Sequence, residues 1–295
     1  MREVAVVTTG FFDGVHLGHR RVLETVVSCA RERGQEAIVV TFWPHPRTVL
    51  QQDAREFRLL TSLEEKKALL LGSGIDRVEV LPFTRAFAAL SAVEYLTMLR
   101  DRFGASLVVM GYDNRIGRDR RTVGELIAAP SPVVSLLPAT ELGLTVAGVE
   151  GAISSTRIRR ALEAGDTALA NAMLGYPYEL YGVVVAGNRL GRTIGFPTAN
   201  MQLYEPLKLV PANGVYAVEA EVLGGKYRGM TNIGVRPTVG GQARTIETHL
   251  LDFDEDIYGL PLRLRFLRRI RDERKFPSLD ALRAQLQQDR FMACR

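Results

Sequence analysis

The chain has 295 residues, of which 46% are hydrophobic, and a formal net charge of +5 at pH 7. This length predicts two domains, each large enough to bury a core without disulfides. The only cysteines, Cys29 and Cys294, are far apart in the sequence, which argues against a disulfide framework and favours the cytoplasm. No apolar run approaches the roughly 18 residues that span a bilayer, so no membrane partner is expected.

The positive charge suits acidic partners, either nucleic acid or phosphorylated small molecules. The arginines are scattered, and no basic block interleaved with aromatic residues marks a nucleic-acid surface. We therefore expect no nucleic-acid partner.

The first segment of interest follows an apolar run at residues 4–7, which predicts a buried strand, and precedes a helical pattern over residues 18–34. Between them, residues 10–19 read GFFDGVHLGH. His16 and His19 are three residues apart, so both can face one ligand if the helix starts there. Free N–H groups at a helix start favour anions, which predicts a cradle for a polyphosphate.

The two histidines are compatible with two other interpretations. A zinc site needs three or four ligands, and no cysteine is suitably spaced. A surface pair that only caps a helix is the more common outcome for His-x-x-His. Glycines at 10, 14 and 18, with Asp13 between them, favour the nucleotide interpretation.

Further apolar runs alternate with helical patterns as far as residue 180, at residues 37–42, 77–83, 106–112 and 132–137. This alternation predicts an α/β domain with a largely parallel sheet, whose ligands bind at the carboxyl ends of the strands. Polar motifs follow several of these strands: the histidines, PHP at residues 44–46, and Gly111 to Asp113.

A helix is predicted from ISSTRIR, residues 153–159, to Gly165. A hydroxyl residue can cap it, and Arg157 and Arg159 lie in or beside its first turn. Because arginine there opposes the helix dipole unless an anion is bound, the segment indicates phosphate binding.

From residue 181 the pattern changes to successive strands, at residues 181–186, 215–222, 227–233, 245–251 and 262–270, followed by a helix over 278–288. Short strands with turn signals predict a small antiparallel barrel or sandwich. The domains are therefore expected at 1–180 and 181–295. Arg263, Arg265 and Arg268 are interpreted as a charged, solvated strand edge.

A glycine-rich loop contains Gly187, Gly191 and Gly195 but lacks the spacing and the lysine of a P-loop, so it could equally be a flexible hairpin. Thr198 and Asn200 follow it, and their oxygens suit magnesium that is also bound by nucleotide phosphates.

Glu247 lies in a predicted strand and is either a solvated residue or a general base. Its strand neighbours leave both interpretations open.

The whole chain resembles the bacterial bifunctional riboflavin kinase and FAD synthetase family. The N-terminal half carries GFFDGVHLGH, TFWPHPR, GYDNRIG and ISSTRIR, and the C-terminal half carries GNRLGRTIGFPTAN, NIGVRPT and ETHLLDFDEDIYG. The resemblance implies a nucleotidyltransferase-type, Rossmann-like N-terminal domain and a β-barrel C-terminal domain with a terminal helix. It also implies two reactions, phosphorylation of riboflavin by ATP to FMN and adenylylation of FMN by ATP to FAD.

The resemblance also implies roles for individual residues. His16, His19 and Glu247 are expected to be catalytic, Thr198 and Asn200 to hold Mg²⁺, and Asn200 and Arg271 to contact flavin. Nucleotide binding is expected from Gly10, Phe11, Asp13, Gly14, Asp113, Ser155, Thr156, Arg157, Arg159, Gly187, Gly191 and Gly195.

Three positions depart from the family pattern. Ala152 stands where a basic residue is common, and Asn114 and Ile116 replace aromatic or histidine residues. Alternatives to the bifunctional enzyme are an adenylyltransferase with an inactive kinase domain, and a flavin-binding or delivery protein. The sequence leaves the oligomeric state open.

Overall fold

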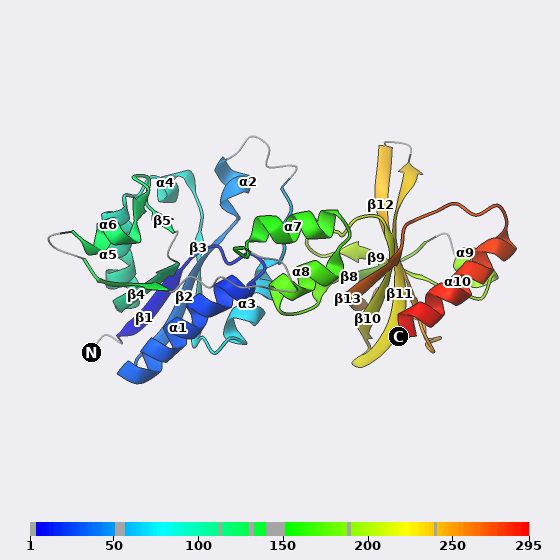
Figure 1. Cartoon of the computed structure of the whole chain (residues 1–295), viewed down its shortest axis with the longest axis horizontal. Helices are drawn as coiled ribbons and strands as arrows, with labels where there is room; N and C mark the ends of the chain where they lie inside the picture. The colour runs from blue at the N-terminus through cyan, green and yellow to red at the C-terminus, as the bar shows by residue number, and fades with distance from the viewer. Residues whose placement is uncertain are drawn as a thin grey trace. The chain divides into compact units, whose positions relative to one another are not determined.

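The protein is described by a computed structural model that covers residues 4–50, 57–111, 114–129, 133–139, 151–187, 190–238 and 241–294. The chain forms two compact units, Met1–Ser155 and Thr156–Arg295. Each unit has its own main sheet (Figure 1).

Unit 1 is built on a five-stranded parallel sheet with the strand order β3-β2-β1-β4-β7. The strands are β1 (Ala5–Thr9), β2 (Glu36–Trp43), β3 (Arg77–Pro82), β4 (Ala105–Gly111) and β7 (Ser135–Ala139). Because the order reverses beside β1, the carboxyl ends of β1 and its neighbours are where such a sheet binds ligands. The parallel α/β fold expected for this half is confirmed.

The other elements of unit 1 connect these strands. They are α1 (Leu17–Arg33), α2 (Pro46–Leu50), α3 (Leu63–Leu71), α4 (Arg85–Ala88), α5 (Ala92–Phe103), β5 (Arg115–Ile116), β6 (Arg121–Thr122) and α6 (Val123–Ile127). Helices α3 and α5 begin with capping boxes, Ser62 with Glu65 and Ser91 with Glu94.

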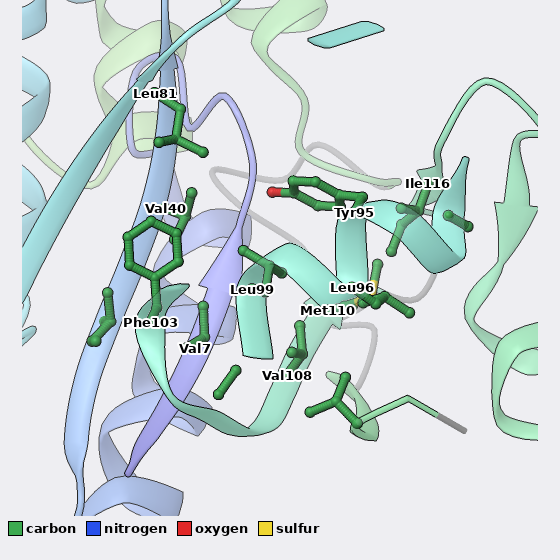
Figure 2. Close-up of a cluster of buried hydrophobic side chains, with 14 of the residues drawn as sticks. Val7, Val40, Leu81, Tyr95, Leu96, Leu99, Phe103, Val108, Met110 and Ile116 are labelled. Carbon is green, nitrogen blue, oxygen red and sulfur yellow. The ribbon is translucent and has the colours of Figure 1, made fainter. Parts of the chain in front are cut away.

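Strand alternation divides the core of unit 1 between the two faces of the sheet. Val6, Val39 and Val109 face α1, while Val7, Val40 and Val108 face α5. Figure 2 shows the second cluster, where Leu96, Leu99 and Phe103 of α5 pack on the sheet. Ile116 also belongs to this cluster, so its side chain packs the core. The sheet is therefore covered on both faces.

Unit 2 begins with helices α7 (Ser155–Glu163) and α8 (Thr167–Leu174) and continues into a closed six-stranded barrel of order β10-β11-β12-β9-β8-β13. The strands are β8 (Tyr178–Val185), β9 (Ala199–Leu203), β10 (Gly214–Val222), β11 (Gly225–Thr238), β12 (Gly241–Leu250) and β13 (Pro261–Arg271). A short helix α9 (Leu190–Thr193) lies in the glycine-rich loop, and α10 (Leu279–Cys294) is C-terminal. The expected barrel with a terminal helix is confirmed.

Barrel closure corrects the expectation that the arginines of β13 guard a strand edge. β13 pairs with β10 on one side and β8 on the other. Arg263 Nη1 lies 2.6 Å from a Glu179 oxygen, and Arg265 lies 3.0 Å from Glu219 and 2.9 Å from Glu221. These arginines pair with carboxylates of neighbouring strands, because the sheet has no free edge there.

The two faces of the barrel differ. Inside, Tyr216 packs against Phe266, and Thr231 and Thr248 share a hydrogen bond of 2.8 Å. Outside, α10 lies against β10, β11 and β13 (Figure 1). Ala293 of α10 joins an outer cluster with residues such as Val215.

The division between the units falls at Ser155/Thr156, whereas the sequence predicts a boundary at residue 181. Helix α8 lies against β8 and β13, and α7 accepts a hydrogen bond at 2.9 Å from the Ala212 N–H to its Leu162 carbonyl. Asn171 of α8 donates to the carbonyl of Phe266 at 2.8 Å and accepts from the backbone N–H of Tyr178 at 2.7 Å. In the described ranges no helix combines the length and apolar character needed to cross a membrane.

Candidate functional sites

The two histidines after β1 lie together at the start of α1. His16 is the N-cap of the helix, and its Nδ1 accepts the backbone N–H of His19 at 3.3 Å. The two imidazole rings stack with centroids 3.6 Å apart and planes 15° from parallel. Because Nδ1 of His16 accepts a hydrogen bond, the proton of its neutral ring is on Nε2, which can donate to a ligand.

His19 is held neutral by its surroundings. Burial lowers its pKa well below 6.5, and the positive charge of Lys66 lowers this pKa further. Its Nδ1 is buried without a hydrogen-bond partner in the described part of the chain. A neutral imidazole can donate a hydrogen bond to a phosphate without itself carrying a charge.

The loop between β1 and α1 is held by Asp13, which is buried. Its carboxylate accepts from the backbone N–H groups of Leu60 at 3.0 Å and Thr61 at 3.1 Å. Gly14 N–H donates to Thr61 Oγ1 at 3.2 Å. These bonds give Asp13 a structural role in the loop, while a direct contact with nucleotide stays a prediction.

Ser155 connects the ISSTRIR segment to this loop, because its Oγ donates to the carbonyl of Asp13 at 2.9 Å. A Cβ at Gly18 would lie 3.2 Å from two atoms of the His16 ring, so glycine leaves room for the imidazole. Thr156, Arg157 and Arg159 follow in α7, whose first turn contains no acidic residue.

Other predicted residues of this half are placed as follows. Gly10 follows β1 and donates to the Val40 carbonyl at 3.1 Å. The ring of Phe11 lies between Phe42, at 5.1 Å, and His45, at 5.3 Å. Asp113 lies outside the described residues.

In unit 2, strand register brings a carboxylate between two amides. Glu247 of β12 pairs with Asn200 of β9 on one side and with Asn232 of β11 on the other. Directly paired residues of antiparallel strands project from the same face, with Cβ atoms about 5 Å apart. Val215 continues the row on β10, which places Glu247 on the outer face of the barrel. Glu247 therefore lies outside the barrel core, between the side chains of Asn200 and Asn232. This position is compatible both with a solvated residue and with a general base.

The glycine-rich loop packs closely against this row. A Cβ at Gly187 would lie 2.1 Å from Asn200 Nδ2, and a Cβ at Gly191 would lie 2.2 Å from the Phe196 carbonyl. Gly195 has φ +82°, a conformation that favours glycine. Thr198 is half-buried just before β9.

His249 fixes the segment that precedes Thr198. Its Nδ1 donates to the Pro197 carbonyl at 2.8 Å, and its ring packs edge-on against Phe196 at 5.2 Å. Burial lowers the pKa of His249, so the ring is neutral at pH 7.

Arg271 has a partner inside the barrel unit. Its Nη2 lies 2.7 Å from Asp289 of α10, and its guanidinium lies 5.5 Å from the Phe276 ring centroid. Its strand, β13, is three strands from the strand of Glu247, β12, in either direction around the closed six-stranded barrel. These contacts indicate that Arg271 attaches α10 to the barrel; its contact with flavin stays a prediction.

Two residues were missed by the sequence interpretation. Asn232 was part of a family motif but had no role, because its pairing with Glu247 depends on register. Lys66 was not singled out, because a lysine in a helical pattern is usually solvent-exposed.

Comparison with known proteins gives a consistent result for both units. A family model for FAD synthetase matches residues 1–141, and one for riboflavin kinase matches residues 174–294. The chain is 37% identical over 294 residues to the bifunctional riboflavin kinase/FMN adenylyltransferase of Bacillus subtilis strain 168, covering 99% of this chain and 92% of that protein. It is 39% identical over 296 residues to the protein of the same name from Escherichia coli strain K12, with the same coverage.

A crystal structure from Streptococcus pneumoniae, titled a macrolide-efflux protein, matches with a TM-score of 0.90 and 34% identity, covering 100% of this chain and 95% of that one. This likeness supports the fold described for each unit. Both family models and the full-length relatives agree on one assignment. The chain belongs to the family of bifunctional riboflavin kinase/FMN adenylyltransferases.

Proposed function

We propose that this protein makes FAD from riboflavin in two steps, using one ATP at each of two separate sites. The observation that carries the proposal is the presence of a distinct polar site in each unit. The barrel has a carboxylate between two amides, and the parallel sheet has two stacked imidazoles at a helix start.

In the barrel, Glu247 accepts the proton of the terminal ribityl hydroxyl of riboflavin. The hydroxyl oxygen then forms a bond to the γ-phosphorus of ATP, the bond to the β-phosphate oxygen breaks, and ADP leaves with FMN as product. Asn200 and Asn232 lie beside the carboxylate and can orient both it and the hydroxyl by hydrogen bonds.

Magnesium fits the oxygens of Thr198 and Asn200. Both are hard neutral ligands, and the glycine at 187 leaves the Asn200 amide a space that a Cβ would fill. The ion would neutralise charge on the ATP phosphates. The loop glycines 187, 191 and 195 allow the backbone to approach those phosphates closely.

In unit 1, FMN supplies its own nucleophile, so no protein nucleophile is needed. A phosphate oxygen of FMN forms a bond to the α-phosphorus of ATP, the α–β bridging bond breaks, and pyrophosphate leaves. His16, His19 and the start of α1 donate hydrogen bonds to the phosphates as charge shifts to the leaving group. Ser155 is proposed for the pyrophosphate side and Asp113 for the nucleoside, while Thr156, Arg157 and Arg159, which belong to unit 2, stay sequence-based predictions for nucleotide binding.

The partners we propose are therefore riboflavin, FMN, FAD, ATP and Mg²⁺. Two free cysteines, Cys29 and Cys294, support the cytoplasm as the compartment.

The first prediction separates the two sites by substitution. Glu247→Gln should lower FMN formation from riboflavin at least a hundredfold, because the base is lost, and leave FAD formation from supplied FMN within twofold. His19→Ala should do the reverse. Chromatography of the flavins formed with Mg²⁺ and ATP, from riboflavin or from FMN, measures both activities in one preparation.

The alternatives give different results in the same assay. FAD from FMN but not from riboflavin would indicate an inactive kinase unit, and unchanged flavin in both reactions would indicate a binding protein. Loss of both activities in each folded variant would contradict the two-site assignment.

A further inference from the structure

Helix α3 carries two adjacent lysines in different environments. Lys66 is 5% exposed, whereas the side chain of Lys67 is 38% exposed and pairs with Glu64 at 3.3 Å. Burying an ammonium group is costly unless its charge is used or compensated. The burial of Lys66 therefore needs an explanation beyond helix formation.

The ammonium of Lys66 lies at the carboxyl ends of β1 and β2. Its Nζ donates to the carbonyls of Phe11 at 3.2 Å and Phe42 at 3.3 Å, and it lies 5.8 Å from the Trp43 ring centroid. Within the described ranges no carboxylate forms an ion pair with it. This edge of a parallel sheet is where ligands bind, and an anionic ligand would compensate the charge.

The groups that face Lys66 set its protonation. Burial lowers the pKa of Lys66 to about 8, and the Asp13 carboxylate opposes this shift. His19 of α1 also faces Lys66, and the charge of Lys66 lowers the pKa of His19. β2 contributes only a carbonyl and the uncharged ring of Trp43. At pH 7 the positive charge is thus on Lys66 and His19 is neutral.

Lys66 also holds the loop that carries the histidines. Phe12 and Val15 have φ of 48° and 36°, which is unfavourable for residues with a Cβ. The bond from Lys66 to the Phe11 carbonyl holds this loop from one side, and Asp13 holds it through Thr61 from the other. The loop leads directly into His16, the N-cap of α1.

We propose that Lys66 is a positioning residue of the adenylylation site. Its ammonium group provides the site with a positive charge held in one place, and it holds the loop that orients the two histidines. An ammonium has three N–H donors, and the two carbonyls use two of them. The charge attracts the polyphosphate of ATP. The inference rests on the proposed adenylyl transfer in unit 1.

The test uses the full chain with Lys66→Met, Lys66→Arg and, as a matched control, Lys67→Met. FAD formation from FMN and FMN formation from riboflavin are measured on the same preparations. Lys66→Met should lower kcat/KM for ATP in FAD formation about ten- to a hundredfold, as for loss of a charged hydrogen-bonding group. Its riboflavin kinase rate should remain within twofold, Lys66→Arg should recover part of the loss, and Lys67→Met should change neither activity.

A pH profile distinguishes charge from packing. Below pH 8 Lys66 is protonated, so FAD formation by the unchanged protein should fall as the pH rises through about 8. Lys66→Arg should lack this fall, because arginine stays protonated. If Lys66→Met fails to fold, the pH profiles of the unchanged protein and of Lys66→Arg still test the role of the Lys66 charge.

FAD formation by Lys66→Met equal to that of the unchanged protein, or the same alkaline fall in Lys66→Arg, would overturn the role of Lys66. Absence of FAD formation by the unchanged protein would overturn the proposed function and this inference with it.

Discussion

At Gly187, the absence of a side chain decides where Asn200 can lie. Alanine is compatible with the backbone there, since φ is not positive, but its Cβ would stand 2.1 Å from Asn200 Nδ2. The amide would have to leave its place beside Glu247. Adding one methyl group at Gly187 therefore tests the region proposed to hold the metal and the base.

Gly187→Ala should raise KM for magnesium ATP in the kinase reaction about tenfold, the cost of one misplaced hydrogen-bonding group. FAD formation from supplied FMN should be unchanged. Steady-state kinetics of both reactions measures this. Gly124→Ala is the control, because a Cβ at Gly124 meets no atom within 4 Å. Equal kinase kinetics in both variants would argue against Asn200 as a ligand.

At the scale of elements, α10 is joined to the barrel by a buried ion pair. Asp289 is 1% exposed, and it accepts from Arg271 at 2.7 Å and from Gln285 at 2.8 Å. The Arg271 side chain is 18% exposed, so removal of the carboxylate leaves a largely buried charge without its partner. Breaking such a pair from one side is strongly destabilising.

Asp289→Asn should lower the free energy of unfolding of unit 2 by about 2 kcal/mol, less than for a fully buried pair because Arg271 keeps some solvent contact. Urea unfolding of unit 2, monitored by the loss of riboflavin kinase activity, gives the shift in midpoint and thus the change in the free energy of unfolding. The control is Arg290→Gln, which removes an exposed pair with Asp252 and should cost less than about 0.5 kcal/mol. Equal midpoints in the two variants would show that the Arg271–Asp289 pair contributes little.

At the scale of the whole molecule, helices α7 and α8 account for most of the difference between two definitions of the barrel unit. The compact unit that contains the barrel begins at Thr156, whereas the family model for riboflavin kinase matches the chain only from residue 174. Met173 of α8 is buried, and α8 lies against β8 and β13. Burial of such a large apolar side chain stabilises a fold by roughly 2 kcal/mol.

A fragment of residues 156–295 should therefore fold and phosphorylate riboflavin. A fragment of residues 181–295 should unfold at a lower temperature or fail to fold, because it lacks both helices and the start of β8. Thermal unfolding and FMN formation compare the two. If the shorter fragment matched the longer one, the boundary at residue 181 would be preferred.

Much of this molecule could be predicted from local pattern. Alternating apolar runs predicted the parallel sheet, turn-punctuated strands predicted the barrel, and the His16–His19 spacing at a helix start predicted a paired site. These features depend on residues close in sequence, whose periodicity and capping act through neighbouring backbone. The motifs also identified the family, which the comparisons confirmed.

The sequence by itself determined the order of the elements and the family, and it predicted the candidate residues. Only the tertiary structure decided that β13 has no free edge, that Asn232 lies beside Glu247, and that Lys66 is buried while Lys67 is not. The physical reason is the same in each case. Barrel closure, strand register and burial are set by contacts between residues distant in the chain, and a one-residue change of register would move Glu247 to the opposite face.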